Sequence, residues 1–269
     1  MSVALLPQRE AEEIQTRFAR DGYLVARGLL ASAEVEELIA NFMAMHAGGP
    51  ISGCFHPVPL EKTGGDILKA YPRMMHPHRV DATARRYLLH PRILAVLTAC
   101  FGEEPLAAQS MLYFKPPTAR GQALHQDDYY LKTSPGRCVA AWIALDPADR
   151  ENGGMLLVPG TQDTPILCPH EADPRLSFTR DEVDVPAGLE PLPIDLRAGD
   201  VLFFNGSIVH GSYPNTSVTR FRRAYIGHYV AGSTQMLSDW YNPLVRPDGS
   251  DVRLPGNPWG GPCGEEHEL

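Results

Sequence analysis

The stretch ALHQDDYYL, residues 123–131, decides how the rest of the chain is interpreted. His125 and Asp127 lie two positions apart in it, and in an extended chain two such residues point to the same face. An imidazole nitrogen and a carboxylate oxygen can therefore converge on one metal ion. His210, in FFNGSIVHGSYPNTS, is the candidate third ligand. The three would form a 2-His-1-carboxylate facial triad, which leaves coordination positions open on non-haem Fe(II).

The second half of the chain has the pattern of a β-rich fold. Short alternating or apolar runs, separated by Gly, Pro and Asp turns, predict strands at 105–115, 139–145, 155–158, 192–196, 201–204 and 221–230. The first half favours helices, at 8–20, 81–89 and 91–99 and in a stretch that Ser32 can cap and Gly48 ends, with a short strand at 23–25. Many short strands after helices predict a mainly β barrel or sandwich with flanking helices.

Two segments have no clear periodicity. Residues 51–80 are rich in Gly, Pro, His and Met, which predicts a long loop that acts as a mobile lid over the site. We interpret His76 and His78 within it as polar loop residues, because the proline between them fits poorly with a second metal site. Residues 242–264 are rich in Pro and Gly, which predicts an irregular tail.

Composition limits the class of protein. The 269 residues, of which 43% are hydrophobic and 21% charged, favour one domain over 1–269, with a helical part to about 104, a β core at about 105–231 and a tail at 232–269. A net charge of −8 without a basic stripe argues against a nucleic-acid partner, and no apolar run is long enough for a membrane. Five cysteines without a C-x-x-C pair, and no evident secretory signal, favour reduced thiols in a cytoplasmic protein. We expect a monomer or a homodimer.

Further stretches follow the His-x-Asp pair in order: AAWIALDP, ENGGMLLVPGT, AGDVLFFNGSIVHGS and RFRRAYIGHYV. From about residue 91 to 230, this order and spacing resemble the phytanoyl-CoA dioxygenase-like family of Fe(II)/2-oxoglutarate oxygenases. The resemblance implies a double-stranded β-helix, or jelly roll, of the cupin-like barrel type, with the metal in its open mouth. It also implies a dioxygenase that hydroxylates a small-molecule metabolite with Fe(II), 2-oxoglutarate and O₂, and releases succinate and CO₂.

The resemblance also implies which residues surround the cosubstrate. Arg222, in FRRA, would bind the far carboxylate, since a guanidinium can form two charge-assisted hydrogen bonds with it. The spacing from His210 is one residue longer than is usual for the family, which leaves Arg220 and Arg223 as competitors. Strand parity favours Arg222, because small Ala224 would leave room for a ligand on the same face. Other residues implied around the cosubstrate are Met111, Gln126, Trp142, Ser212 and, as a weaker match, Lys69. Core packing explains Met111 and Trp142 nearly as well.

Substrate selection is predicted to depend on residues 51–80 and 163–190, and on Asp128, Tyr129 and Tyr130 beside the triad. These groups would suit a small polar or amine-bearing metabolite, and acyl-CoA is not favoured because no basic patch is evident. Related halogenases have a small residue where this chain has Asp127, so the aspartate favours oxygenation. Two alternatives remain: a cupin-like metal-dependent hydrolase, and a non-catalytic small-molecule binding module on the same barrel.

Overall fold

Two antiparallel sheets form the centre of the computed structural model, which describes residues 6–258. The larger sheet has the order β1-β10-β5-β12-β3-β13-β14, and β2 also pairs with β3. Its strands are β1 (Tyr23–Ala26), β2 (Met74–Met75), β3 (Pro105–Lys115), β5 (Val139–Ala144), β10 (Val201–Asn205), β12 (Arg222–Ala231), β13 (Leu244–Val245) and β14 (Asp251–Val252).

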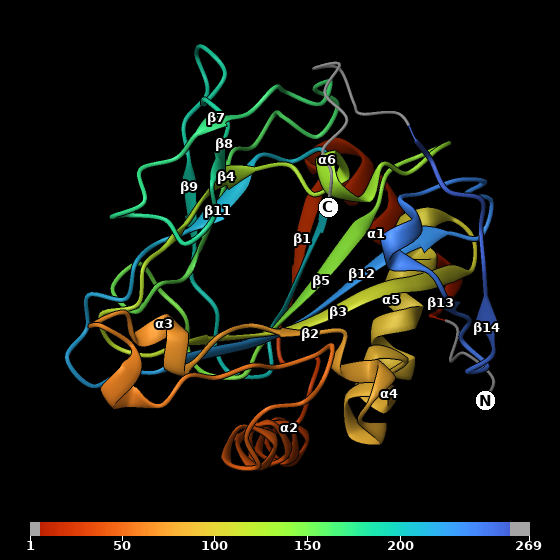
Figure 1. Ribbon diagram of the computed structural model, residues 1–269. Coiled ribbons are helices and arrows are strands. Elements are labelled where there is room, and N and C mark those ends of the chain that lie inside the picture. Colours follow the sequence, from red (N-terminus) through yellow and green to blue (C-terminus); the bar gives the residue numbers. More distant parts are fainter. Residues whose placement is uncertain (1–5, 259–269) are drawn as a thin grey trace.

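The smaller sheet lies opposite the larger one (Figure 1) and has the order β4-β11-β6-β9. Its strands are β4 (Gln122–His125), β6 (Met155–Leu157), β9 (Leu192–Ile194) and β11 (His210–Ser212). A separate hairpin pairs β7 (His170–Glu171) with β8 (Asp181–Glu182). Two facing antiparallel sheets confirm the predicted jelly roll.

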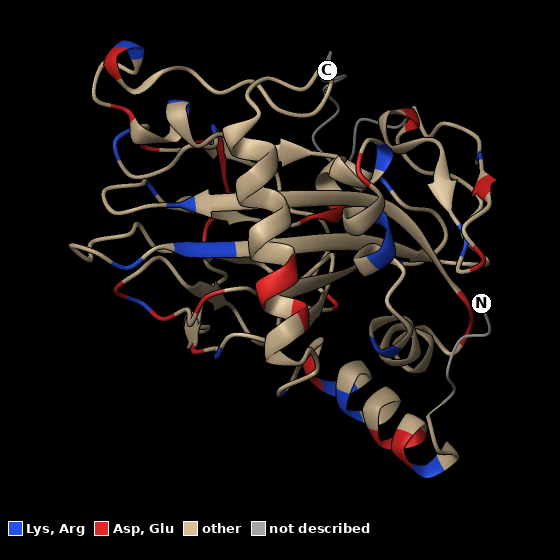
Figure 2. Ribbon diagram, turned by 90° about the horizontal axis from the view of Figure 1, so that it is seen from below, with Lys and Arg blue, Asp and Glu red and all other residues tan. Residues whose placement is uncertain are grey.

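Both faces of the larger sheet are buried, and its strands carry few charged residues (Figure 2). On β12, Ala224 and Ile226 belong to the apolar cluster between the sheets. Tyr225 and Tyr229 point the other way, and their hydroxyls donate to the backbone oxygens of Ala84 (2.8 Å) and Leu88 (2.7 Å). The alternation expected for a strand therefore separates an inner face from an outer face that helices cover.

The helices of the first half cover that outer face. They are α1 (Gln8–Asp21), α2 (Ser32–Ala47), α4 (Ala82–Leu88) and α5 (Pro91–Phe101), and two single-turn helices, α3 (Ile67–Ala70) and α6 (Asp128–Leu131), lie in loops. The short 3-10 helices are η1 (Leu60–Lys62), η2 (Pro77–Arg79) and η3 (Asp239–Tyr241). Ser32 is not the cap of α2, because Ala31 occupies that position and its N–H donates to the Glu34 carboxylate at 2.7 Å.

The mobile lid expected at residues 51–80 stays a prediction, and parts of the segment are packed against the barrel. Phe55 belongs to the outer core, and β2 pairs with β3 through Met74 and Met75. His76 and His78 are buried rather than solvent-exposed loop residues. The C-terminal tail is also more regular than predicted, since it contains η3, β13 and β14.

The cysteines do not all match the expectation of reduced thiols. Cys54, Cys100 and Cys138 are free, whereas Cys168 is disulfide-bonded. Cys263 lies outside the described residues. Within residues 6–258, no helix has the length and apolar character that a bilayer crossing requires.

Candidate metal centre

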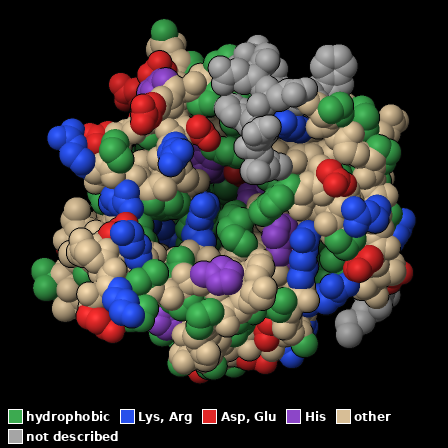
Figure 3. Space-filling view, viewed as in Figure 1, with side chains coloured by type: hydrophobic (Ala, Val, Ile, Leu, Met, Phe, Trp, Pro, Cys, Tyr) green, Lys and Arg blue, Asp and Glu red, His purple; other side chains and the backbone are tan. Residues whose placement is uncertain are grey.

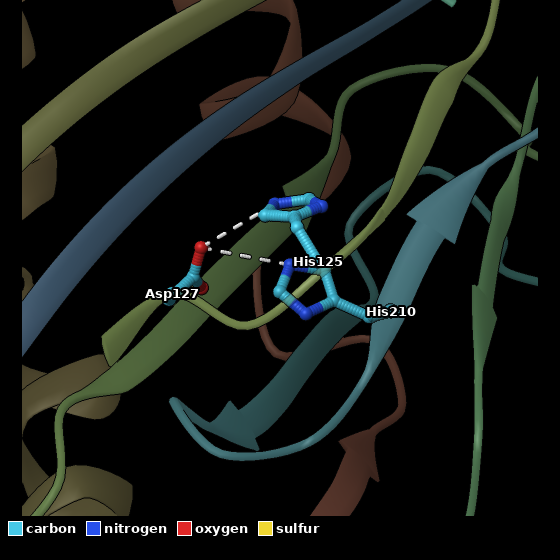
Figure 4. A group of neighbouring side chains, drawn as sticks. All are labelled: His125, Asp127 and His210. Carbon is cyan, nitrogen blue, oxygen red and sulfur yellow. Dashed lines mark ion pairs between the residues drawn. The ribbon is translucent and has the colours of Figure 1, made fainter. Parts of the chain in front are cut away.

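His125 and His210 face each other on neighbouring strands of the smaller sheet. They are direct partners in the antiparallel register of β4 and β11, and their ring centroids are 4.2 Å apart. Antiparallel pairing thus brings together two residues that are far apart in the chain. Both side chains are buried, and both point to the same place beside Asp127 (Figure 4).

The backbone holds both imidazoles in the orientation that metal ligation needs. Nδ1 of His125 lies 2.9 Å from the carbonyl oxygen of Ala123, and Nδ1 of His210 lies 2.9 Å from that of Ile208. A carbonyl can only accept, so each Nδ1 carries a proton and each Nε2 is the nitrogen on the side of Asp127. Burial and the neighbouring His125 lower the pKa of His210 to about 4, so its ring is neutral at physiological pH.

Asp127 completes the cluster by a different backbone route from the one predicted. The residue has helical angles (φ −65°, ψ −34°) immediately before α6, so the extended geometry assumed for the His-x-Asp pair is wrong. Its Oδ1 nevertheless lies 3.6 Å from Nε2 of both His125 and His210. The described residues contain one group of three or more metal-ligating side chains of this kind, and it is His125, Asp127 and His210.

A third histidine, His228 on β12, contacts the other oxygen of this carboxylate. Its Nε2 lies 3.0 Å from Oδ2 of Asp127. Burial by itself would raise the pKa of Asp127, but the surrounding His228, His210 and His125 hold it well below its usual range. The carboxylate is therefore charged, with Oδ1 turned toward the two histidines and Oδ2 occupied by His228.

A narrow inner cavity leads from the cluster to Arg222 and is lined by Met111, Trp142, Ser212 and Arg222 as well as the cluster itself. Arg222 is buried on the inner face, its Nε donates to the Gly153 carbonyl at 3.1 Å, and its guanidinium lies 5.4 Å from the Trp142 ring centroid. Its Nη1 has no hydrogen-bond partner among the described residues. Burial lowers the pKa of Arg222 only to about 10, so it remains a cation.

The two competing arginines already have carboxylate partners. Arg223 forms a fork with Asp146, with contacts of 2.8 and 2.7 Å. Arg220 binds Asp149 at 2.6 Å and Glu151 at 3.1 Å. The parity argument for Arg222 therefore agrees with the structure, in which only Arg222 of the three points into the inner cavity.

Other predicted site residues lie away from both cavities. The Gln126 side chain donates to the Ser207 carbonyl (2.7 Å) and accepts from the Leu167 N–H (2.7 Å), so it joins two loops and lines neither cavity. Lys69 is exposed on α3 and also lines neither.

Asp128, expected beside the substrate, is buried, where it accepts hydrogen bonds from the Thr133 hydroxyl (2.7 Å) and from the Cys138 N–H (3.1 Å). A substrate role for Asp128 is therefore not supported, because these internal contacts turn its carboxylate away from the pocket.

Tyr129 and Tyr130 line a larger outer cavity of about 480 Å³, which meets the inner one at the metal cluster. Several residues around the site were not predicted individually: Arg73, Phe178 and Arg180, which lie within the predicted segments 51–80 and 163–190, and Gln122, Trp240 and the buried Lys115 beside Ser212. The amide nitrogen of Gln122, on β4, lies 3.1 Å from Nε2 of His125.

Known proteins resemble the chain in both sequence and fold. The family model described as phytanoyl-CoA dioxygenase (PhyH) matches residues 18–224. The phytanoyl-CoA dioxygenase domain-containing protein 1 of Rattus norvegicus is 32% identical over 70% of this chain and 65% of its own length. The peroxisomal phytanoyl-CoA dioxygenase of the same species is 24% identical over 82% of this chain and 68% of its own length. The chain thus spans just under two thirds of the first of these relatives.

Solved structures show the same fold. The epimerase SnoN in complex with Fe³⁺, alpha ketoglutarate and nogalamycin RO superposes with a TM-score of 0.66 over 85% of this chain and 86% of that one, at 23% identity. The non-heme monooxygenase ThoJ superposes with a TM-score of 0.66 over 90% and 88%, also at 23% identity.

Proposed function

This chain belongs to the phytanoyl-CoA dioxygenase family, and we propose that it is a non-haem Fe(II)/2-oxoglutarate-dependent dioxygenase that hydroxylates a small-molecule metabolite. In this reaction one atom of O₂ enters the substrate as a hydroxyl group and the other enters succinate, while C1 of 2-oxoglutarate leaves as CO₂. The substrate carbon is oxidised by two electrons and 2-oxoglutarate supplies the other two that O₂ requires.

The donor set fits ferrous iron. His125 and His210 each offer an imidazole nitrogen and Asp127 offers one carboxylate oxygen, all from buried side chains and within 4.8 Å of one another. Two imidazoles and one carboxylate leave positions for a cosubstrate and O₂. When bound there with 2-oxoglutarate, iron would supply the activation of O₂ that oxidises an unreactive C–H bond.

The unpartnered Nη1 of Arg222 is the observation that carries the assignment. A buried guanidinium N–H without an acceptor is costly, so this atom calls for an anionic ligand in the inner cavity. 2-Oxoglutarate has one carboxylate for the metal and a second, several bonds away, for Arg222. The hydrolase would give this arginine no role, and a non-catalytic binding module should lack one or more of the metal ligands, whereas His125, Asp127 and His210 are all present.

Asp127 supports oxygenation rather than halogenation. It occupies the position that must be vacant for a halide to bind the metal, and its Oδ1 is turned toward the metal side of the cluster. The outer cavity, which opens onto the same cluster, is where a substrate carbon would approach.

The test uses the purified chain without oxygen. Addition of Fe(II) and 2-oxoglutarate should produce a weak visible charge-transfer band, which appears only if both bind at one centre. A zinc hydrolase or a non-catalytic binding module would give no such band with Fe(II). Absence of the band would therefore reject the proposal. Once a substrate is found, the new hydroxyl should carry label from ¹⁸O₂ and not only from labelled water.

A further inference from the structure

The outer cavity has a charge that the sequence did not suggest. Three basic side chains line it, from Arg73, Lys132 and Arg180. Its carboxylates are Asp127, which belongs to the metal cluster, and Asp181, which accepts a hydrogen bond from the Tyr130 hydroxyl at 2.9 Å. The cavity is therefore basic in a chain whose overall net charge is −8.

Arg73 is held in place by aromatic rings. Its guanidinium carbon lies 5.6 Å from the ring centroid of Tyr113 and 5.3 Å from that of Phe178, and Nη1 donates to the Tyr113 hydroxyl at 3.3 Å. Such contacts orient a guanidinium but leave its charge uncompensated. Among the described residues, no carboxylate lies within ion-pairing distance of Arg73, whereas Arg120 is paired with Asp66.

Arg180 and Lys132 add positive charge to the same outer cavity. Neither side chain has an ion pair or hydrogen-bond partner within residues 6–258, and both line the cavity. Figure 3 shows a hollow in the middle of this face, with apolar side chains inside it and basic side chains beside it. Three unpaired cations around one cavity repel a cationic ligand and attract an anion.

The rest of the wall is apolar and aromatic. Met75 and Met111 come from β2 and β3, and rings come from Tyr113, Phe178, Trp240 and Tyr241. A volume of about 480 Å³ lies within the usual size of small-molecule sites. Flat rings and thioethers suit a compact apolar or aromatic body between the basic side chains and the metal.

We propose that the substrate is a small organic anion, whose acidic group is bound by Arg73 with support from Arg180, and whose apolar body lies against the aromatic wall toward the metal. This proposal rests on the proposed function and names the substrate class of the same site. It keeps the small polar metabolite of the sequence-based expectation and replaces the amine-bearing alternative with an acidic one.

The experiment compares ligands that differ only in charge. Hydrocinnamate, its uncharged amide and phenylpropylamine share one body and are titrated into the protein near neutral pH, with binding followed by calorimetry. Hydrocinnamate should bind at least about tenfold more tightly than the amide or the amine, as expected for a charge-assisted contact. Its CoA thioester forms a fourth arm, in which the acid is masked and the negative charges are moved to phosphates.

The variants test the assigned cations. Arg73→Gln should weaken hydrocinnamate about tenfold and Arg180→Gln about threefold, while both leave the amide unchanged. Arg17→Gln, which removes an exposed charge from α1, is the matched control and should change nothing. The charge-transfer band with Fe(II) and 2-oxoglutarate should persist in all three variants, because Arg222 lies in the other cavity.

Equal binding of acid, amide and amine would overturn the proposal, and so would unchanged acid binding by Arg73→Gln. Failure of hydrocinnamate to bind to a protein that shows the charge-transfer band would reject the organic-anion class and leave the oxygenase assignment intact. Absence of the band would reject the oxygenase assignment itself. If the CoA thioester bound more tightly than the free acid, and Arg73→Gln did not affect its binding, the negative charge of the ligand would be recognised elsewhere. That result would also overturn the proposal.

Discussion

Lys115 and Arg222 are direct partners across β3 and β12, so two buried basic residues are neighbours on the larger sheet. Lys115 donates through Nζ to the Ser212 hydroxyl and to the Tyr213 carbonyl, both at 2.7 Å. Burial and the nearby Arg222 lower the pKa of Lys115 well below its usual value. Two buried basic groups so close together favour an anionic ligand, which supports the carboxylate site that we propose at Arg222.

Arg222→Ala should weaken 2-oxoglutarate binding at least ~30-fold, because loss of one partner from a buried charge pair costs roughly 2–5 kcal/mol. Arg220→Ala and Arg223→Ala should weaken it less than about fivefold, since both side chains are already paired near the surface. Anaerobic titration of the Fe(II) protein with 2-oxoglutarate measures all three. A large loss in Arg220→Ala or Arg223→Ala with none in Arg222→Ala would move the carboxylate site.

Lys115 should take up a proton when 2-oxoglutarate binds. The far carboxylate of 2-oxoglutarate, bound at Arg222, would raise the lowered pKa of the lysine amine. Binding enthalpies should therefore differ between two buffers of different ionisation enthalpy. The size of the difference should correspond to uptake of a fraction of one proton per 2-oxoglutarate bound. Lys115→Met, which keeps the length of the side chain, should remove that difference. Identical enthalpies for the unmodified protein in both buffers would show that the lysine is already charged.

Much of the fold could be predicted because its signals are local. The alternation at 221–230 placed Arg222 on the inner face, and β3 was predicted with its observed bounds, Pro105–Lys115. Both are long strands whose two faces meet different surroundings, so the residue types alternate. The short strands β4 and β11, which carry the two histidines, are too brief to show such a pattern.

The missed features depend on contacts between distant parts of the chain. Asp127 turns into α6, where Asp128 is held by the Cys138 N–H ten residues later. Arg73 becomes a cavity residue because rings from β3 and from the loop before β8 hold it. Neither arrangement has a sequence signal, since an isolated arginine in an aperiodic segment looks like surface charge.

His125→Ala, Asp127→Ala and His210→Ala should each fold and each lose measurable Co(II) binding, because two remaining ligands hold a divalent ion poorly. Circular dichroism checks folding, and Co(II) absorbance, with the ion standing in for Fe(II), measures binding. If His210→Ala retained metal affinity and turnover, the triad assignment would fail and His228 would be the next ligand to examine.

His76 and His78 should make the protein sensitive to mild acid. Burial lowers the pKa of each to about 3, whereas the unfolded chain titrates near 6.5. Above the pKa of the unfolded chain, the folded and unfolded states bind equal numbers of protons at these rings. Between that pKa and about 3, only the unfolded state gains protons. The free energy of unfolding should therefore fall between about pH 6.5 and pH 3, by up to about 1.4 kcal/mol per pH unit for each ring.

Urea unfolding at a series of pH values tests this, with His78→Asn as the variant. The Asn amide can keep the contact that Nδ1 makes with the Ser110 hydroxyl, at 2.6 Å, without a titratable group. Its slope below pH 6.5 should be shallower by up to about 1.4 kcal/mol per pH unit. The control is His170→Asn at an exposed site. An unchanged slope in His78→Asn would show that this ring is not the source of the acid sensitivity.

His228 should set metal affinity without being a ligand. By donating Nε2–H to Oδ2 of Asp127 at 3.0 Å, it leaves Oδ1 as the oxygen that faces both histidines. Loss of such an outer partner typically costs 10–100-fold in metal affinity, so His228→Leu should bind Co(II) about that much more weakly. His228→Gln, whose amide nitrogen can replace Nε2 as a donor, should recover most of the loss. His46→Leu, at a histidine that bonds the Ala70 carbonyl instead, is the control. Equal loss in the leucine and glutamine variants would mean that ring shape, not the hydrogen bond, holds Asp127 in place.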